Sequence, residues 1–306
     1  MIPKTFFPSS PRLVRGVAYG LIAIVLSSAG DVSAAEEANF EVLLGKAKAA
    51  YSLGKRDEAL SHASRAIEAE PKNPQGYFVR ARFYEESRQP AKAVADYDQV
   101  LKLDPKVPAA WQHRGGEHFK LGQIKESIAD FDKFLELVPQ QEPHHWQRGI
   151  AYYYAGRFED GRKQFESHQT VNANDVENAV WHFLCVARSA GVEKARAALI
   201  PIKGDGRVPM MGVHALFAGK AKPEDVLKAA GAGQPASPRL VQQLFFAHLY
   251  LGLYFEALGD DKQAREHIEK ATGEYRTEDY MGDVARVHLQ LRWPKEKTAA
   301  KESKTP

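Results

Sequence analysis

The chain has 306 residues, of which 44% are hydrophobic and 26% are charged. These proportions are ordinary for a folded protein and exclude wholesale disorder, and the length allows two ordinary domains or one extended repeat array. The 42 basic and 39 acidic residues nearly cancel, which leaves no strong positive field to attract polyanions. We therefore expect no nucleic-acid partner.

The first 34 residues have the pattern of a cleaved secretory signal peptide. Three basic residues precede an apolar run in 16–30, and small residues at 32–35 offer a cut after Ala34 or Ala35. Because this run is shorter than the roughly 20 residues that span a bilayer, cleavage is favoured over an uncleaved anchor. No cysteine near the cut could carry a lipid. We expect a protein exported to the bacterial periplasm or secreted, with no stable membrane span after cleavage and with 39 basic and 38 acidic residues left.

A 34-residue period organises the next part of the chain. Pro71, Pro105 and Pro139 stand 34 residues apart. Equivalent positions in successive units, which we call a column, also share a residue type at this spacing. Three more columns are a small one (Ala47, Ala81, Gly115, Gly149), a basic one (Lys46, Arg80, Arg114, Arg148) and a bulky one (Leu43, Tyr77, Trp111, His145). Self-similarity at one period indicates a repeat architecture, in which each unit buries its apolar face against its neighbours.

Each unit is expected to form two antiparallel helices. In the first half a bulky and a small residue lie four apart, as Trp111 and Gly115 do, which places them on one helical face. A turn follows, where three units have glycine in one column and the second unit has Arg88-Gln89-Pro90 instead. The second half carries apolar residues at spacings of three and four, and a proline then ends the unit because it cannot continue a helix.

This pattern of aromatic, small and closing proline residues in 34-residue units resembles tetratricopeptide repeats. The resemblance is clearest in 77–105 and 111–139, holds in 43–71 and loosens in 145–174, and a fifth unit at 176–200 has drifted. It implies an all-α fold, with a right-handed solenoid of helix-turn-helix units over 36–200. It also implies a scaffold or adaptor that binds other proteins.

After residue 200 the period breaks. Residues 201–238 are rich in glycine and proline, which we interpret as an irregular insertion with short helices at 210–218 and 223–230. We expect 239–293 to form a C-terminal repeat-like unit, whose last helix, 280–291, caps the open end of the array. Residues 294–306 are expected to form a disordered tail.

The segment Ala247–Asp260 and the separate last unit resemble NlpI-type periplasmic repeat adaptors. That resemblance implies a role in presenting envelope enzymes to their substrates. The chain lacks the lipid-attachment cysteine of those proteins, so membrane tethering is not implied.

First helices usually line the concave face of such an array, where a partner segment can lie. Their residues outside the small and bulky columns describe an aromatic groove with a basic edge. We predict that this groove binds a peptide or helix through Lys48, Tyr51, Phe78, Arg82, Gln112, Phe119, Trp146 and Tyr153. The alternative for the aromatic members is a place in the core. The arginines of the basic column are expected to pack their stems and pair with nearby acidic residues.

Signals for other functions are weak. The eleven histidines show no H-E-x-x-H spacing, and Cys185 is the single cysteine, so we expect no metal site, internal disulfide, cofactor or catalytic residue. The paired asparagines of a carboxylate-binding repeat clamp are also missing. Two alternatives stay open: an envelope enzyme with a site in 201–238, and a homo-oligomer that uses 210–291 as its interface.

Overall fold

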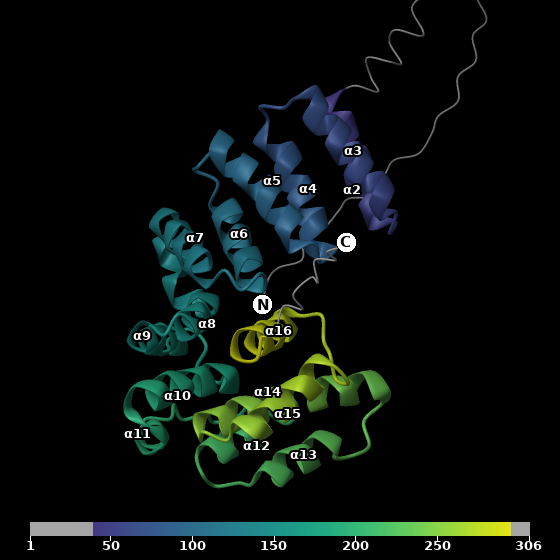
Figure 1. Cartoon of the computed structure of the whole chain (residues 1–306). Helices are drawn as coiled ribbons and strands as arrows, with labels where there is room; N and C mark the ends of the chain where they lie inside the picture. Colours follow the sequence, from purple (N-terminus) through teal and green to yellow (C-terminus); the bar gives the residue numbers. More distant parts are fainter. Residues whose placement is uncertain (1–38, 295–306) are drawn as a thin grey trace, which may run out of the picture.

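The computed structural model describes residues 39–294, so the predicted signal peptide and nearly all of the predicted tail lie outside the described residues. The described part is all-α, and its helices follow one another as a solenoid of pairs (Figure 1). The first three pairs are α2 (Phe40–Ser52) with α3 (Arg56–Ala69), α4 (Pro74–Glu86) with α5 (Pro90–Leu103), and α6 (Pro108–Lys120) with α7 (Ile124–Leu137). A short 3-10 helix, η1 (Pro139–His144), leads to α8 (Trp146–Tyr154) and α9 (Phe158–Gln169).

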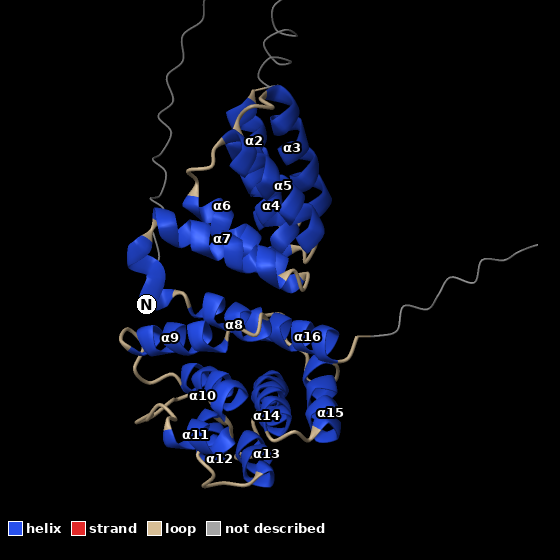
Figure 2. Ribbon diagram, turned by 60° about the vertical axis from the view of Figure 1, so that its left-hand side comes forward, coloured by secondary structure: helices blue, strands red, loops and turns tan. Residues whose placement is uncertain are grey.

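The second half contains α10 (Val176–Ala190), α11 (Val192–Ala197), α12 (Met210–Phe217), α13 (Pro223–Gly231), α14 (Ser237–Ala257), α15 (Asp261–Thr272) and α16 (Tyr280–Arg292). In Figure 2, α8, α9 and α16 form a layer between the three upper pairs and the lower group of α10 to α15.

Local chemistry explains where the helices start and turn. The side chains of Asn39 and Asn73 cap α2 and α4, and a proline in the first turn starts α4, α5 and α6. The turns inside the first, third and fourth pairs place glycine at φ between 73° and 75°, a backbone region that a side chain disfavours. Arg88 holds the same place in the second pair with φ of 56°.

The small column lets the two helices of a pair approach closely. A Cβ added to Gly115 would lie 2.7 Å from the Phe131 ring, and one on Gly149 would lie equally close to Phe165. The C-terminal pair repeats this relation, because a Cβ on Gly252 would lie 2.6 Å from Ile268, sixteen residues further on. α14 and α15 therefore pack as a repeat pair.

The basic column ties neighbouring pairs together. Arg114 donates to Asp130, sixteen residues ahead in its own pair, and to Asp98, sixteen residues back in the preceding pair, at 2.6–2.8 Å. Arg80 makes the same bridge to Asp96 and Ser64. The expected pairing of these arginines with nearby acidic residues is confirmed.

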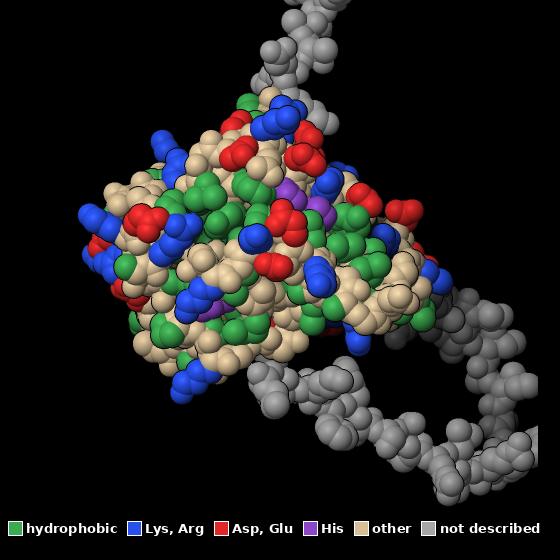
Figure 3. Space-filling model, turned by 90° about the horizontal axis from the view of Figure 1, so that it is seen from below, with side chains coloured by type: hydrophobic (Ala, Val, Ile, Leu, Met, Phe, Trp, Pro, Cys, Tyr) green, Lys and Arg blue, Asp and Glu red, His purple; other side chains and the backbone are tan. Residues whose placement is uncertain are grey.

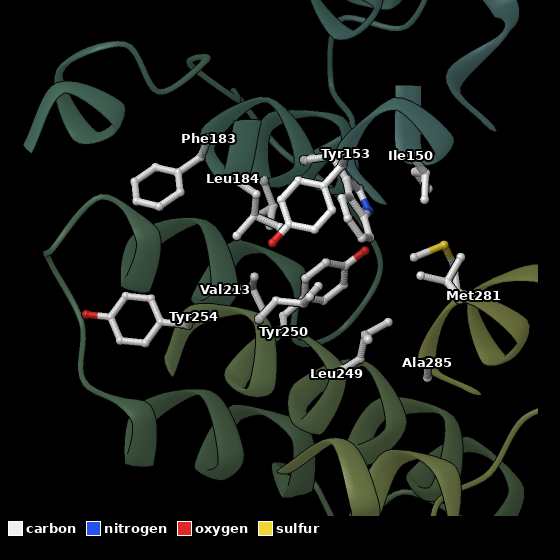
Figure 4. Close-up of a cluster of buried hydrophobic side chains, with 14 of the residues drawn as sticks. Ile150, Tyr153, Phe183, Leu184, Val213, Leu249, Tyr250, Tyr254, Met281 and Ala285 are labelled. Atoms are coloured by element: carbon white, nitrogen blue, oxygen red, sulfur yellow. The ribbon is translucent and has the colours of Figure 1, made fainter. Parts of the chain in front are cut away.

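Residues 201–238, predicted as an irregular helical insertion, are part of the core of the C-terminal half. Their two short helices form where the sequence places them, as α12 and α13, but Met210, Val213 and Phe217 are fully buried in one core with α10 and α14. Figure 4 shows Val213 between Leu184 of α10 and Tyr250 of α14. The two short helices predicted at 210–218 and 223–230 are confirmed, and the apolar face of α12 joins them to the core of the C-terminal half.

The last helix also departs from expectation. α16 packs against α15 and reaches α6 of the third pair, so that it lies inside the curve of the solenoid instead of beyond its end (Figure 1). Its buried residues include Met281, Val284, Ala285 and Val287. The predicted capping of the open end needs correction, because the apolar face of α16 is used on the inner face of the array.

Candidate protein-binding site

The inner face of the array, lined by α2, α4, α6 and α8, is divided into a covered and an open part. α16 lies over α6 and α8, whereas no helix within residues 39–294 crosses the face of α2 and α4 (Figure 1). The eight residues predicted to bind a partner fall on both sides of this division. They therefore do not form one continuous open groove.

Phe119 and Tyr153 belong to the covered part. Both side chains are fully buried, at 0% and 1% exposure, so the expectation that they line an open groove is wrong. Phe119 stacks on Tyr280 of α16 with ring centroids 5.7 Å apart, and the Tyr153 hydroxyl donates to Glu256 at 3.0 Å. Burial raises the pKa of Tyr153, which keeps its hydroxyl protonated.

Trp146 stands at the border between the two parts. Its ring meets Tyr280 edge-on at 5.0 Å, and the side chain is half-buried. Tyr280 thus takes the place between Phe119 and Trp146 that a partner's aromatic side chain would need.

Arg88 fastens α16 to the second pair. Its guanidinium donates to the Glu278 carbonyl at 2.9 Å, lies 2.8 Å from the Glu278 carboxylate and pairs with Asp283. Asp283 is buried and also pairs with Arg286 at 2.7 Å. The sequence carries a signal for this contact, because Arg88 is the residue that replaces the turn glycine of the other units.

The open part contains the remaining predicted residues. Lys48 is exposed, whereas Tyr51, Phe78, Arg82 and Gln112 are half-buried. Tyr51 stacks on the Phe83 ring of α4 at 4.3 Å, which fixes its orientation. Gln112 is held by hydrogen bonds to Gln147 at 2.7 Å and to His145 at 2.6 Å.

Phe78 forms one wall of an apolar cavity of about 240 Å³ that opens between α4, the end of α5 and the start of α6. The other lining residues are Pro74, Gln75, Val100 and Val107. A cavity of this kind suits a single apolar side chain of a partner, because four of its five lining residues are apolar and the fifth, Gln75, is exposed to solvent.

A polar cluster borders this cavity, and the sequence did not single it out. The Glu85 carboxylate accepts from the Tyr97 hydroxyl at 2.8 Å, and it pairs with Arg82 at 3.1 Å and with His113 at 3.3 Å. Burial alone would raise the pKa of Glu85, but His113, Arg82 and Tyr97 hold it at about 2. Phe78 meets the rings of Tyr97 and His113 edge-on at 5.7 and 5.9 Å. The sequence gives a hint in its period, because Glu85 stands 34 residues from Tyr51 and from Phe119, at a position that is aromatic in the other units.

Two further features bear on other functions. None of the helices within 39–294 has the length and apolar character that crossing a membrane requires. Among the same residues, no three histidine, cysteine or acidic side chains gather as metal ligands. Cys185 is buried, and burial raises the pKa of its thiol.

Helices that pack in consecutive pairs through a column of small residues, with the first helix of each pair on the inner face, are typical of helical repeat proteins. Residues 44–108 and 84–142 match the tetratricopeptide repeat family. Over these residues the chain carries tetratricopeptide repeats, and the described part continues as an all-α solenoid of helix pairs. No curated protein matches it in sequence.

Two of the similar solved structures agree with the fold, and a third matches a shorter stretch of the chain. A tetratricopeptide repeat protein from Parabacteroides merdae is 16% identical with a TM-score of 0.56, over 83% of this chain and 98% of that one. The MamA protein is 13% identical with a TM-score of 0.50, over 61% of this chain and 94% of that one. The first repeat domain of Spaghetti, bound to an HSP90 peptide, is 30% identical with a TM-score of 0.32, over 33% of this chain and 79% of that one.

Proposed function

We propose that the chain is an exported, non-enzymatic adaptor that binds a peptide or helix of an envelope protein on the open part of its inner face. The observation that carries the proposal is the apolar cavity lined by Phe78 of α4, whose ring meets Tyr97 and His113 beside the pair of Arg82 and Glu85. Repeat proteins of this family serve as scaffolds for protein–protein interaction, and their inner face is where a partner segment lies.

The composition of the open part fits a binding surface. Phe78 and Tyr51 offer aromatic area, and Arg82 and Lys48 supply a basic edge. Tyrosine and arginine are among the residue types that dominate binding energies in interfaces. Hydrogen bonds hold Arg82 against Glu85, so its position is set before a partner arrives. Such pre-organisation lowers the entropy lost on binding.

The packing of α16 supports the proposal that the inner face can bind a helix. It is an amphipathic helix that already packs across the inner face over α6 and α8. A partner helix on α2 and α4 would continue along the same face, using a neighbouring stretch of the array.

A display library of random peptides, selected on the immobilised mature protein, tests the proposal. Selected peptides should carry a large apolar residue, and Phe78→Ala should weaken their binding by about tenfold or more, in line with an interface anchor. Leu258→Ala is a matched control, since Leu258 is 45% exposed in the turn between α14 and α15. Equal loss with both variants, or peptides indifferent to Phe78→Ala, would contradict the site.

The homo-oligomer alternative rests on the C-terminal half. Figure 3 shows the end of the molecule where α12 and α13 lie, with apolar side chains at the surface between scattered basic and acidic ones. Met211 and Val208, at 38% and 42% exposure, lie in this region. Light scattering at several protein concentrations measures whether copies associate.

A further inference from the structure

A cavity of about 150 Å³ lies beneath α16, apart from the open groove. Two indoles, Trp146 of α8 and Trp181 of α10, form part of its wall, together with Ile150, Phe165, Asp175, Glu177, Asn178 and Met281. Figure 4 shows Ile150 and Met281 facing each other from α8 and α16 on one side of this region. The volume corresponds to about five water molecules, so it admits only a small ligand.

Carboxylates outnumber cations around the cavity. Asp175 and Glu177 line it, and Arg207 pairs with both of them and with Asp205. One guanidinium thus faces three carboxylates. The Tyr250 hydroxyl lies 2.5 Å from Glu177, and a ring nitrogen of His168 lies 4.0 Å from Asp175. Buried negative charge in excess is unfavourable unless a further cation or proton neutralises it.

Glu177 is one of the two carboxylates that line the cavity, and its side chain is 17% exposed. It accepts from the Tyr250 hydroxyl at 2.5 Å and pairs with Arg207. Burial raises the pKa of Glu177 even in the presence of Arg207, so a second positive charge nearby would stabilise the ionised carboxylate.

Two polar atoms of the lining residues have no partner. The Asn178 side chain is 3% exposed and donates to the Phe165 carbonyl at 3.0 Å, but its Oδ1 accepts no hydrogen bond. The Trp181 indole is 1% exposed, and its Nε1 donates none. Buried polar atoms are rarely left unpaired in folded proteins. A cationic donor would satisfy Asn178 Oδ1 and also balance the carboxylates that line the cavity. An oxygen atom of the same ligand would accept the hydrogen bond that Trp181 Nε1 can donate.

We propose that this cavity binds a small primary ammonium ion that carries a neighbouring hydroxyl, a ligand of the amino-alcohol class. The ammonium group donates to Asn178 and neutralises the excess charge at Glu177, while the hydroxyl oxygen accepts from Trp181. The two indoles supply aromatic walls, which attract a cation. Because the ligand is enclosed between α10 and α16, its binding would also fasten α16 in place.

Ethanolamine is the probe, and quenching or enhancement of tryptophan fluorescence at constant ionic strength is the readout. A saturable change is expected with ethanolamine. Ethylene glycol, which has the oxygen without the charge, and propylamine, which has the charge without the oxygen, should each bind at least tenfold more weakly. Binding of ethylene glycol as tight as that of ethanolamine, or no saturable change with ethanolamine, overturns the proposal.

Variants test the residues. Glu177→Gln should weaken ethanolamine binding at least tenfold, whereas Glu193→Gln, whose side chain is 86% exposed on α11, should leave it unchanged. If Glu177→Gln does not fold, the relative affinities of the three probes for the unaltered chain still test whether the cavity binds an amino alcohol. Equal binding by a folded Glu177→Gln variant contradicts the site.

Discussion

Replacement of Arg114 by methionine tests how the basic column stabilises the array. The methionine keeps an apolar stem of similar length but removes the guanidinium, which makes two hydrogen bonds to Asp130 and lies over the Trp111 ring. Asp130 is 3% exposed, and its remaining partner is His118 at 3.8 Å. An uncompensated buried charge costs about 3–5 kcal/mol, so Arg114→Met should lower the free energy of unfolding by about 3 kcal/mol.

The next unit supplies the matched control. Arg148 occupies the same position, but its forward partner is the neutral Gln164 at 2.9 Å, and its backward partner Asp132 has a side chain that is 41% exposed. Arg148→Met leaves no buried carboxylate without a partner and should cost only about 1–2 kcal/mol. Urea denaturation followed by circular dichroism measures both. If Arg148→Met costs as much as Arg114→Met, the buried charge is not the cause and the reasoning fails.

Two more predictions concern packing and pH. Gly115→Ala should lower the free energy of unfolding by about 1–3 kcal/mol because its Cβ would meet the Phe131 ring at 2.7 Å, whereas Gly116→Ala, with nothing within 4 Å, should raise it by about 0.5–1 kcal/mol. Loss of stability in both variants would contradict this assignment of the small column. Burial lowers the pKa of His248 and of His288 to about 4, from an ordinary 6.5, so protonation favours the unfolded chain. Their contribution is complete above pH 6.5 and is lost as the pH falls toward 4, by about 2 kcal/mol each between pH 7 and pH 5. Thermal unfolding across this range should show less acid destabilisation in His288→Gln, and an unchanged slope would refute the assignment.

The sequence predicts the repeat units well because each unit is held by contacts within itself and with the next one. The proximity of Gly115 to Phe131, and of Arg114 to Asp130, is a relation of sixteen residues that recurs with the period. Gly252 and Ile268 keep the same relation in the C-terminal pair. Because these contacts recur with the period, the spacing of residue types along the chain is enough to predict them.

The binding surface was less predictable because the docking of α16 depends on contacts far apart in the chain. Arg88 and Glu278 are 190 residues apart, and no period connects them. The apolar face of α16 indicates that the helix must pack, but it does not say against what. For that reason the sequence predicts that Phe119 and Tyr153 line an open groove, although the structure buries both.

The measurement that tests the central claim most directly is a cross-link between the second repeat pair and α16. Arg88→Lys places an amine beside Glu278 and Asp283, and a carbodiimide joins an amine to a carboxylate only when the two are in contact. Mass spectrometry of the monomer should then find position 88 linked to 278 or 283, with mixed isotope labelling showing that both ends belong to one chain. Absence of this link, with lysine–carboxylate links inside α6 and α7 still formed, would mean that α16 does not lie across the inner face.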